Sequence, residues 1–304
     1  MNTSQILFLM GKGGTGKSTA SAIAGFLLAS QEKKVMVISL DAAHNLSDIY
    51  EKQLAHKPCE IYPFLYAGEI DQEKMIQKYL KDVQNSLKQR YSYLTAFNIG
   101  DYFDILKYSP GLEEYALILA FTDIIKKFSD FDYFIFDMPP TALSLKFFNL
   151  PFLSCKWIEH LENLRCEINK KKEIISRVKF AGKEYERDKI LSKIRELKKL
   201  YQNVGKIFQD SDRTSIYAVV NHNPLAVSET NLIFKNLKKI NISLKKIIWN
   251  KKRIDESFSE RDNSFNSVPF FSLPFSDHEL TGFKELNRYI KTFSLKISDF
   301  LPLS

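Results

Sequence analysis

The sequence predicts an α/β fold with a mostly parallel, twisted sheet that is flanked by helices. Three observations lead there: short apolar runs recur, helical stretches separate them, and polar residues follow the ends of several runs. Runs that are apolar throughout are typical of parallel strands covered on both faces. The six runs are residues 5–10, 34–40, 133–136, 216–220, 246–249 and 270–273.

Polar side chains stand just beyond four of these runs, at Asp41, Asp137, Asn221 and Asn250. Ligands of open parallel sheets bind in the crevice outside the carboxyl ends of the strands. We therefore expect the functional site at this edge of the sheet.

The chain of 304 residues predicts a single domain, residues 1–304, with a helical subdomain built from about 72–128 and 152–210. In the second stretch, apolar residues recur at helical spacing on both sides of a break at Ala181 and Gly182, which predicts a hairpin of two amphipathic helices. The apolar positions between Leu286 and Phe300 also have helical spacing. We expect them to pack on the sheet, with a membrane-binding tail as the alternative.

Composition narrows the class of protein. Hydrophobic residues make up 44%, which supports a sizeable core, and no apolar run approaches the roughly 18 to 20 residues that span a bilayer. The first ten residues predict a strand rather than a secretory signal. The cysteines Cys59, Cys155 and Cys166 form no C-x-x-C pair, so we expect a cytoplasmic protein with neither a disulfide scaffold nor a structural zinc.

The positive charge is concentrated in one segment. The net charge is +8, and residues 156–206 hold 15 lysines and arginines against 8 aspartates and glutamates. The rest of the chain is therefore close to neutral, and we expect no nucleic-acid partner. An anionic or membrane partner would dock on this helical segment.

A glycine-rich loop carries the clearest chemistry. Residues 11–19 have the sequence G-K-G-G-T-G-K-S-T, which matches G-x-x-x-x-G-K-[ST] between a predicted strand and a predicted helix. Backbone N–H groups of such a loop converge on phosphate oxygens, while Lys17 spans the β and γ oxygens and the Ser18 hydroxyl binds Mg²⁺. We therefore expect ATP and Mg²⁺ as ligands. The predicted nucleotide-binding residues of the loop are Gly13, Gly14, Thr15, Gly16, Lys17, Ser18 and Thr19.

A second lysine, Lys12, stands at the start of the loop, where an ordinary phosphate loop needs none. This K-G-G-x-G-K-[ST] variant resembles the signature-lysine class of nucleotide-dependent dimers. The class includes the MinD and ParA ATPases, the nitrogenase iron protein, the arsenical-pump ATPases and the tail-anchored-protein targeting ATPases. The resemblance implies a homodimer in which Lys12 acts in catalysis on the nucleotide of the facing subunit.

Residues 41–48, D-A-A-H-N-L-S-D, resemble the switch I motif D-P-A-H-[SN]-L-S-D of the arsenical-pump and tail-anchored-protein targeting ATPases, and only Ala42 departs. This resemblance assigns Asp41 the role of orienting and polarising the attacking water. Similar segments extend over nearly the whole chain. They are residues 65–71, 109–114, 229–230 and 273–282.

Residues 136–146 resemble the switch II of the same ATPases less closely. Asp137 keeps the Walker B position and, by the resemblance, holds a water molecule of the Mg²⁺ ion. Ala142 replaces a glycine, which removes backbone freedom from a segment expected to move with the γ-phosphate. Asn250 matches an asparagine that contacts the purine edge. The position of a nucleotide-contacting glutamate falls on Asn223, to which we assign no role.

The resemblance implies a Mg-dependent ATPase of the ArsA type. It would cycle between an ATP-closed and an open homodimer, to drive an arsenical (anion) pump or to deliver a hydrophobic membrane-protein client. Three alternatives stay open: a ParA/MinD-like positioning ATPase, an electron-transfer subunit like the nitrogenase iron protein, and a nucleotide-gated binding module with little turnover. Cys155 and Cys166 are eleven residues apart and can share a helix face, so whether they bind a ligand is also open.

Overall fold

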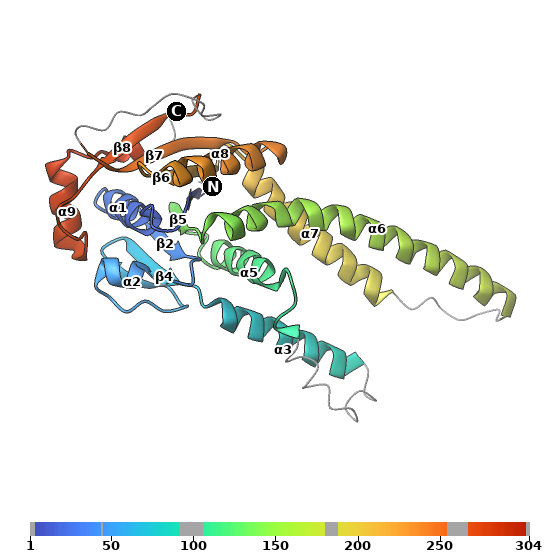
Figure 1. Cartoon of the computed structure of the whole chain (residues 1–304). Coiled ribbons are helices and arrows are strands. Elements are labelled where there is room, and N and C mark those ends of the chain that lie inside the picture. Colours follow the sequence, from blue (N-terminus) through green and yellow to red (C-terminus); the bar gives the residue numbers. More distant parts are fainter. Residues whose placement is uncertain (1–3, 44, 91–105, 180–187, 254–266, 302–304) are drawn as a thin grey trace.

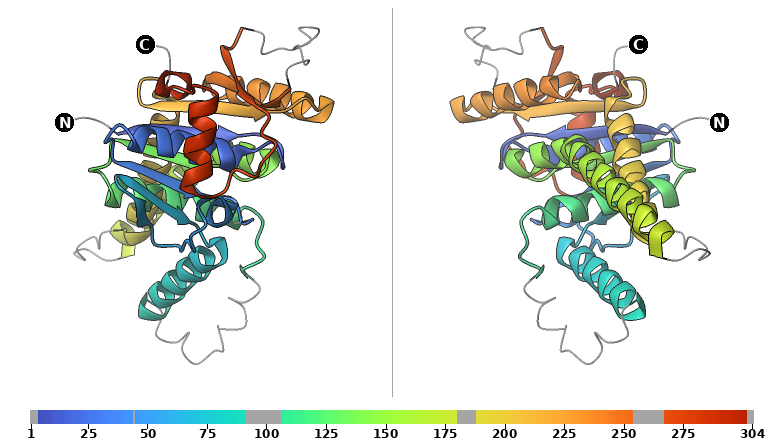
Figure 2. Two further views of the ribbon diagram at one scale, coloured as in Figure 1. Left: turned by 90° about the vertical axis from the view of Figure 1, so that its left-hand side faces the viewer. Right: turned by 90° about the vertical axis from the view of Figure 1, so that its right-hand side faces the viewer.

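Eight strands form one sheet in the order β3-β4-β2-β5-β1-β6-β7-β8, and helices cover both of its faces (Figures 1 and 2). The computed structural model describes residues 4–43, 45–90, 106–179, 188–253 and 267–301. Neighbouring strands are parallel except for the edge pair β3–β4. The predicted fold class, a mostly parallel sheet flanked by helices, is confirmed.

The strands are β1 (Gln5–Met10), β2 (Val35–Ser39), β3 (Cys59–Tyr62), β4 (Leu65–Glu69), β5 (Tyr133–Asp137), β6 (Thr214–Val220), β7 (Leu244–Lys252) and β8 (Phe270–Pro274). The helices are α1 (Lys17–Ala29), α2 (Asn45–Tyr50), α3 (Gln72–Arg90), α5 (Leu112–Lys127), α6 (Thr141–Lys179), α7 (Lys189–Gln209), α8 (Pro224–Lys239), α9 (Gly282–Thr292) and α10 (Ile297–Phe300).

All six predicted apolar runs are strands, but the sequence did not indicate β3 and β4 as strands. They form a short antiparallel hairpin at the sheet edge, and half of β3 is exposed, so its pattern lacks the apolar continuity of the others. β7 is also longer than predicted. Asn250 therefore lies within β7, not beyond its end, whereas Asp41 and Asn221 do follow their strands.

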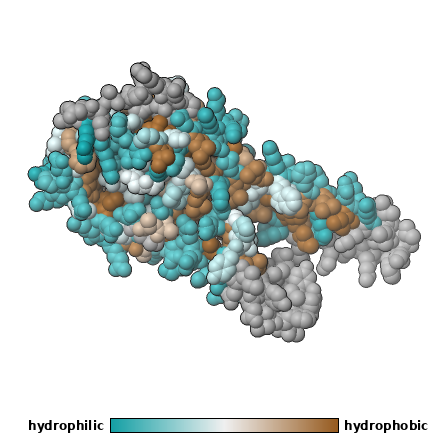
Figure 3. Space-filling model, in the orientation of Figure 1, coloured by the Kyte–Doolittle hydropathy of each residue, from teal (hydrophilic) through white to brown (hydrophobic). Residues whose placement is uncertain are grey.

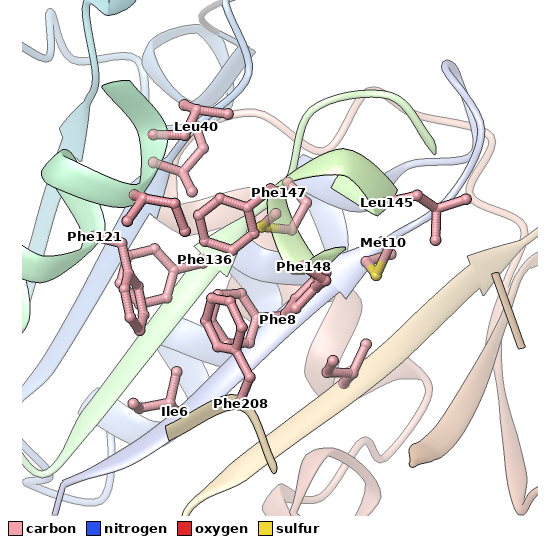
Figure 4. Packing of buried hydrophobic residues seen from close by; sticks show 14 of the residues in the cluster. Ile6, Phe8, Met10, Leu40, Phe121, Phe136, Leu145, Phe147, Phe148 and Phe208 are labelled. Atoms are coloured by element: carbon pink, nitrogen blue, oxygen red, sulfur yellow. The ribbon is translucent and has the colours of Figure 1, made fainter. Parts of the chain in front are cut away.

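The sheet separates two apolar layers because successive residues of a strand point to opposite faces. In β1, Phe8 joins the cluster beneath α3, α5, α6, α7 and α8, while Leu7 and Leu9 join the cluster beneath α1, α2, α9 and α10. The ring of Phe8 lies 5.2 Å from that of Phe136 and 5.0 Å from that of Phe148 (Figure 4). This aromatic cluster fastens the beginning of α6 to the central strands.

Helices α6 and α7 project from the sheet as a long arm (Figure 1). Glu162 of α6 accepts hydrogen bonds from Arg195 at 2.8 Å and from Lys198 at 3.1 Å, both on α7. The predicted antiparallel pair is present, but α6 begins at Thr141 rather than near residue 152, and it contains Pro151 without ending there. The predicted break at residues 181–182 lies outside the described residues.

The C-terminal segment packs on the sheet, as expected. Leu286, Ile290 and Phe300 are buried in the same cluster as α1, so the membrane-tail alternative is wrong for these residues. Along the described parts of the chain, no helix combines the length and the apolar character that crossing a membrane requires.

A buried lysine fixes this segment to the sheet. Lys246 of β7 is 5% exposed, and its Nζ donates to the carbonyl oxygens of Ser298, Asp299 and Leu301 at 3.3, 2.7 and 2.8 Å. The three donors of one ammonium group thus serve three carbonyls at the end of α10, where a positive charge is also favourable.

Replacement of this lysine tests its contribution. Lys246→Met keeps the aliphatic stem but removes all three donors, so the free energy of unfolding should fall by about 2 to 4 kcal/mol. Urea denaturation measures the change, and Lys245→Met, at the half-exposed neighbouring position, is the control. Equal stability of the two variants would contradict this role.

Candidate functional site

The phosphate loop lies between the end of β1 and the start of α1, and two of its glycines are required by close packing. Gly11 has φ +151°, and a Cβ there would lie 2.3 Å from the carbonyl oxygen of Val219 in β6. Gly16 has φ +90°, and a Cβ there would lie 2.1 Å from Nδ2 of Asn250. Larger residues at either place would displace the loop, which explains the first two fixed positions of the motif.

The carbonyl oxygen of Lys12 organises the inside of the loop. This oxygen accepts two hydrogen bonds from Thr15, one from Oγ1 at 2.8 Å and one from the Thr15 backbone N–H at 3.3 Å. Nζ of the buried Lys17 lies 3.5 Å from the same oxygen. The backbone of Lys12 is therefore held firmly, while its side chain stays 29% exposed. Phosphate binding by this loop, which the motif predicts, stays a prediction.

Asn250 supports the loop from β7. Its Nδ2 donates to the carbonyl oxygen of Thr15 at 2.7 Å, and its Oδ1 accepts from the backbone N–H of Lys251 at 2.9 Å. Both ends of the amide are thus engaged within the chain. The amide still has a second N–H and a second lone pair on Oδ1, so the predicted contact with the purine stays a prediction.

Ser18 and Asp137, the two residues predicted to hold Mg²⁺, lie together. The Ser18 hydroxyl donates to Oδ2 of Asp137 at 2.6 Å, and Oδ1 of Asp137 is buried without a hydrogen-bond partner among the described residues. An unpartnered carboxylate oxygen next to a hydroxyl suits a hard cation that binds oxygen ligands.

The charge of Asp137 is poorly compensated. Its side chain is completely buried, and this burial, with smaller contributions from Asp41 and Glu69, raises its pKa to about 7. The Ser18 hydrogen bond and the charge of Lys17 oppose the increase but do not cancel it. Asp41 and Glu69 stand at the ends of the neighbouring strands β2 and β4, and a divalent cation at Asp137 would compensate its buried charge.

Asp41 occupies the bend after β2. Its backbone N–H donates to Oγ of Ser39 at 3.2 Å, and its Oδ1 accepts from the backbone N–H of Ala43 at 3.2 Å. The predicted role of Asp41 in orienting water stays a prediction. His44, part of the predicted switch I motif, lies outside the described residues.

Glu69 is a site residue whose contacts the sequence did not indicate. This buried carboxylate accepts from the Ser47 backbone N–H at 2.9 Å and from its hydroxyl at 2.7 Å, and it thereby holds the start of α2, the helix that follows Asp41. The only signal in the sequence was its place in a segment that resembles the family motif E-I-D.

Switch II leads directly into α6. Ala142 lies in the first turn of this helix, so the residue in place of the glycine continues a helical backbone. The hydroxyl of Ser144 donates to the Pro139 carbonyl at 2.6 Å, and Lys146 pairs with the buried Glu114 of α5 at 3.0 Å. Residues 136–146 resemble switch II, and residues 109–114 resemble another motif of the same ATPases. The ion pair between Lys146 and Glu114 joins these two segments.

A family model described as anion-transporting ATPase matches residues 4–262. The chain belongs to this family. A putative arsenical pump-driving ATPase 2 from Aquifex aeolicus is 26% identical, over 98% of this chain and 99% of that protein. ATPase GET3A from Arabidopsis thaliana is 28% identical over 82% of this chain and 67% of that protein, and ATPase get3 from Aspergillus niger is 29% identical over 84% and 74%.

The predicted enzyme class is confirmed: the chain is an ATP hydrolase of this family. The structure brings Ser18 and Asp137 together, sets Asn250 against the loop, and places Asn223 as the N-cap of α8, where its Oδ1 accepts from the Leu225 backbone N–H at 2.9 Å. This capping contact is a structural role for Asn223. The individual roles of the predicted site residues stay predictions.

Cys155 and Cys166 are half-buried on the side of α6 that meets α7. Burial is the main cause that raises the pKa of the Cys155 thiol, with Glu159 adding to the shift. Among the described residues, no three His, Cys, Asp or Glu side chains are grouped closely enough to hold a metal ion.

The pKa of Asp137 predicts a pH dependence of the free protein. Because its folded pKa, about 7, exceeds the unfolded value of 3.8, the folded state binds the extra proton and loses stability as pH rises between these values. Asp137→Asn removes this loss of stability. The free energy of unfolding of the variant, minus that of the wild type, should therefore increase by roughly 3 kcal/mol between pH 4 and 7 and level off above pH 7.

Thermal unfolding without nucleotide or metal, over this pH range, measures the difference between the two proteins. The contributions of the other titrating groups to stability are common to both proteins and cancel in this difference. A difference that does not change with pH would contradict the unusual ionisation of Asp137.

Proposed function

We propose that this ATP hydrolase depends on Mg²⁺ and works as a homodimer that ATP closes and hydrolysis opens, in order to bind and deliver a hydrophobic membrane-protein client. The observation that carries the proposal is the junction of the site with the arm, since Asp137 ends β5 and α6 begins at Thr141. The proposal includes a cytoplasmic location, which the three free cysteines favour.

Ser18 and Asp137 are the residues that would hold Mg²⁺, by the fit described above. The ion, when bound, neutralises charge on the β- and γ-phosphate oxygens. Lys17 and the backbone N–H groups of the loop bind the same phosphates. Asp41 orients the water that attacks the γ-phosphorus, while the bond to the β–γ bridging oxygen breaks and ADP leaves.

The position of the Lys12 side chain supports the proposed homodimer. Its backbone is pinned within the loop, but its partly exposed amine is not directed into its own phosphate cradle: it lies 4.0 Å from Glu229 of α8. From such a position the amine is free to meet a phosphate across a symmetric interface. Two triphosphates would then be neutralised in part by the lysines of the facing subunits.

An apolar stripe on α6 supports a hydrophobic client. Leu153, Trp157 and Leu164 are 63%, 66% and 55% exposed, and their spacing of four and seven residues places them on one face of the helix. Apolar side chains gather along the arm in Figure 3. The exposed Lys156 and Lys170 border the stripe, which suits a segment that must be kept from water until it meets a membrane.

The arsenical-pump alternative is favoured by one relative, the putative arsenical pump-driving ATPase 2, which matches nearly the whole chain. The half-buried position of Cys155 and Cys166, without further grouped ligands in the described residues, speaks against a thiol site on the arm. We therefore place the membrane-protein client first.

The hydrolytic step is tested at Asp41. Asp41→Asn should bind ATP and Mg²⁺ as the wild type does, because the residue touches neither the loop nor Ser18. It should lower the steady-state turnover by about 100-fold or more, since an amide orients water poorly. Nucleotide binding by calorimetry and phosphate release measure the two effects, and undiminished turnover would remove the mechanism.

The same variant serves as a trap for the dimer. With ATP and Mg²⁺, Asp41→Asn should sediment as a dimer, whereas the double variant with Lys12→Ala should stay monomeric while still binding ATP. A trapped protein that remains monomeric at concentrations well above those in the ATPase assay would overturn the homodimer.

The client is tested by fluorescence. A hydrophobic helical peptide should shift the emission of Trp157 to the blue, and the other tryptophan, Trp249, is 6% exposed and changes little. Leu164→Ser should weaken peptide binding about tenfold. Leu225→Ser, at an equally exposed position on α8, is the matched control and should bind as the wild type. Stimulation of ATP hydrolysis by arsenite, without any response to peptide, would favour the pump alternative instead.

A further inference from the structure

Glu229 connects three parts of the molecule that carry separate motifs. It lies on α8, and its Oε2 accepts a hydrogen bond from the hydroxyl of Thr141 at 2.7 Å. Its Oε1 lies 4.0 Å from Nζ of Lys12. One carboxylate thus contacts the lysine of the phosphate loop and the first residue of α6, which are far apart in the sequence.

The two contacts differ in strength. Thr141 is 5% exposed, and its part-buried bond to Glu229 is short and holds the carboxylate in place. The Lys12 and Glu229 side chains are 29% and 33% exposed, and their separation is at the outer limit of an ion pair. Such a pair contributes little to stability and is easily broken. Glu229 is therefore a fixed anion beside a lysine that can move away.

The neighbouring Thr230 has a purely structural part. It is 1% exposed, and its hydroxyl donates to the Ala226 carbonyl at 2.9 Å within α8. The hydrogen bond lies within the helix, while the burial of Thr230 shows that this side of α8 faces the protein interior. Glu229, the preceding residue, stands beside this buried side and contacts Thr141 and Lys12.

We propose that Glu229 is a positioning residue that holds Lys12 on its own subunit until nucleotide closes the dimer. The inference rests on the proposed function, because it needs Lys12 to engage the facing subunit. The amine must leave Glu229 before it can neutralise a phosphate across the interface, so the carboxylate opposes closure. Its bond to Thr141 sets where the carboxylate stands, which ties the strength of this opposition to the position of α6.

The charge and the hydrogen bond can be separated by two substitutions. Glu229→Gln keeps an oxygen that accepts from Thr141 but removes the charge that attracts Lys12. Thr141→Val removes the hydrogen bond but keeps the charge. Glu285→Gln is a matched control, since Glu285 of α9 is 30% exposed and pairs with Arg288 at 3.6 Å on the same helix.

The experiment measures ATP-dependent dimerisation by sedimentation in the Asp41→Asn background. Glu229→Gln should lower the ATP concentration at half-maximal dimer by about two- to fivefold, the range expected for a partly exposed ion pair. Because salt screens this pair, the difference from the parent should shrink as ionic strength rises. Glu285→Gln should match the parent. Thr141→Val, which loosens the carboxylate but keeps its charge, should ease closure less than Glu229→Gln does.

Each other outcome decides against the inference. If the parent dimerises with ATP but Glu229→Gln does so equally well or less well, Glu229 does not oppose closure. If Thr141→Val eases closure as much as Glu229→Gln, a change of packing rather than charge is responsible. A parent that stays monomeric with ATP would overturn the proposed homodimer, and the role of Glu229 with it. Thermal unfolding of every variant confirms that each is folded.

Discussion

The fully buried carboxylate of Asp137 is the constraint on which the site depends. It stands at the end of a central strand, beside the first turn of the helix that follows the phosphate loop, and one of its oxygens has no partner among the described residues. A buried carboxylate is unfavourable unless a proton or a cation compensates it. The charges of Glu69 and Asp41 raise the pKa of Asp137 further and make its ionised form less favourable. The parallel strand arrangement creates this situation, because it brings the carboxyl ends of β2, β4 and β5 to one edge of the sheet.

The same strand end also begins the connection to the arm. Four residues after Asp137 the chain enters α6, a helix of 39 residues whose first turns are packed into the aromatic cluster around Phe8. Lys146 joins this helix to α5 through Glu114. In the proposed function, a displacement at Thr141 would be carried along this helix to the exposed stripe at Leu153 and Trp157. This continuity gives the proposed coupling between nucleotide and client a physical path.

The packing of the phosphate loop explains why glycines stand at positions 11 and 16. Gly11 is confined by the Val219 carbonyl and Gly16 by the Asn250 amide, so both neighbours come from strands far along the sequence. Asn250 was predicted as a purine contact, and the structure adds that its amide donates to the loop backbone and accepts from Lys251. Sequence alone does not indicate this second role, because it depends on which groups the fold brings within hydrogen-bond distance.

The sequence by itself determined the fold class, six of the eight strands, the phosphate loop and the family, because apolar periodicity and motif spacing are local properties of the chain. Only the tertiary structure decided the long-range contacts: Glu69 with Ser47, Glu229 with Lys12 and Thr141, and Lys246 with the end of α10. It also decided that α6 starts at Thr141, where burial in the aromatic cluster allows a helix to continue through Pro151. Charged side chains look alike in a sequence, and their partners are chosen by the packing of elements that lie far apart along it.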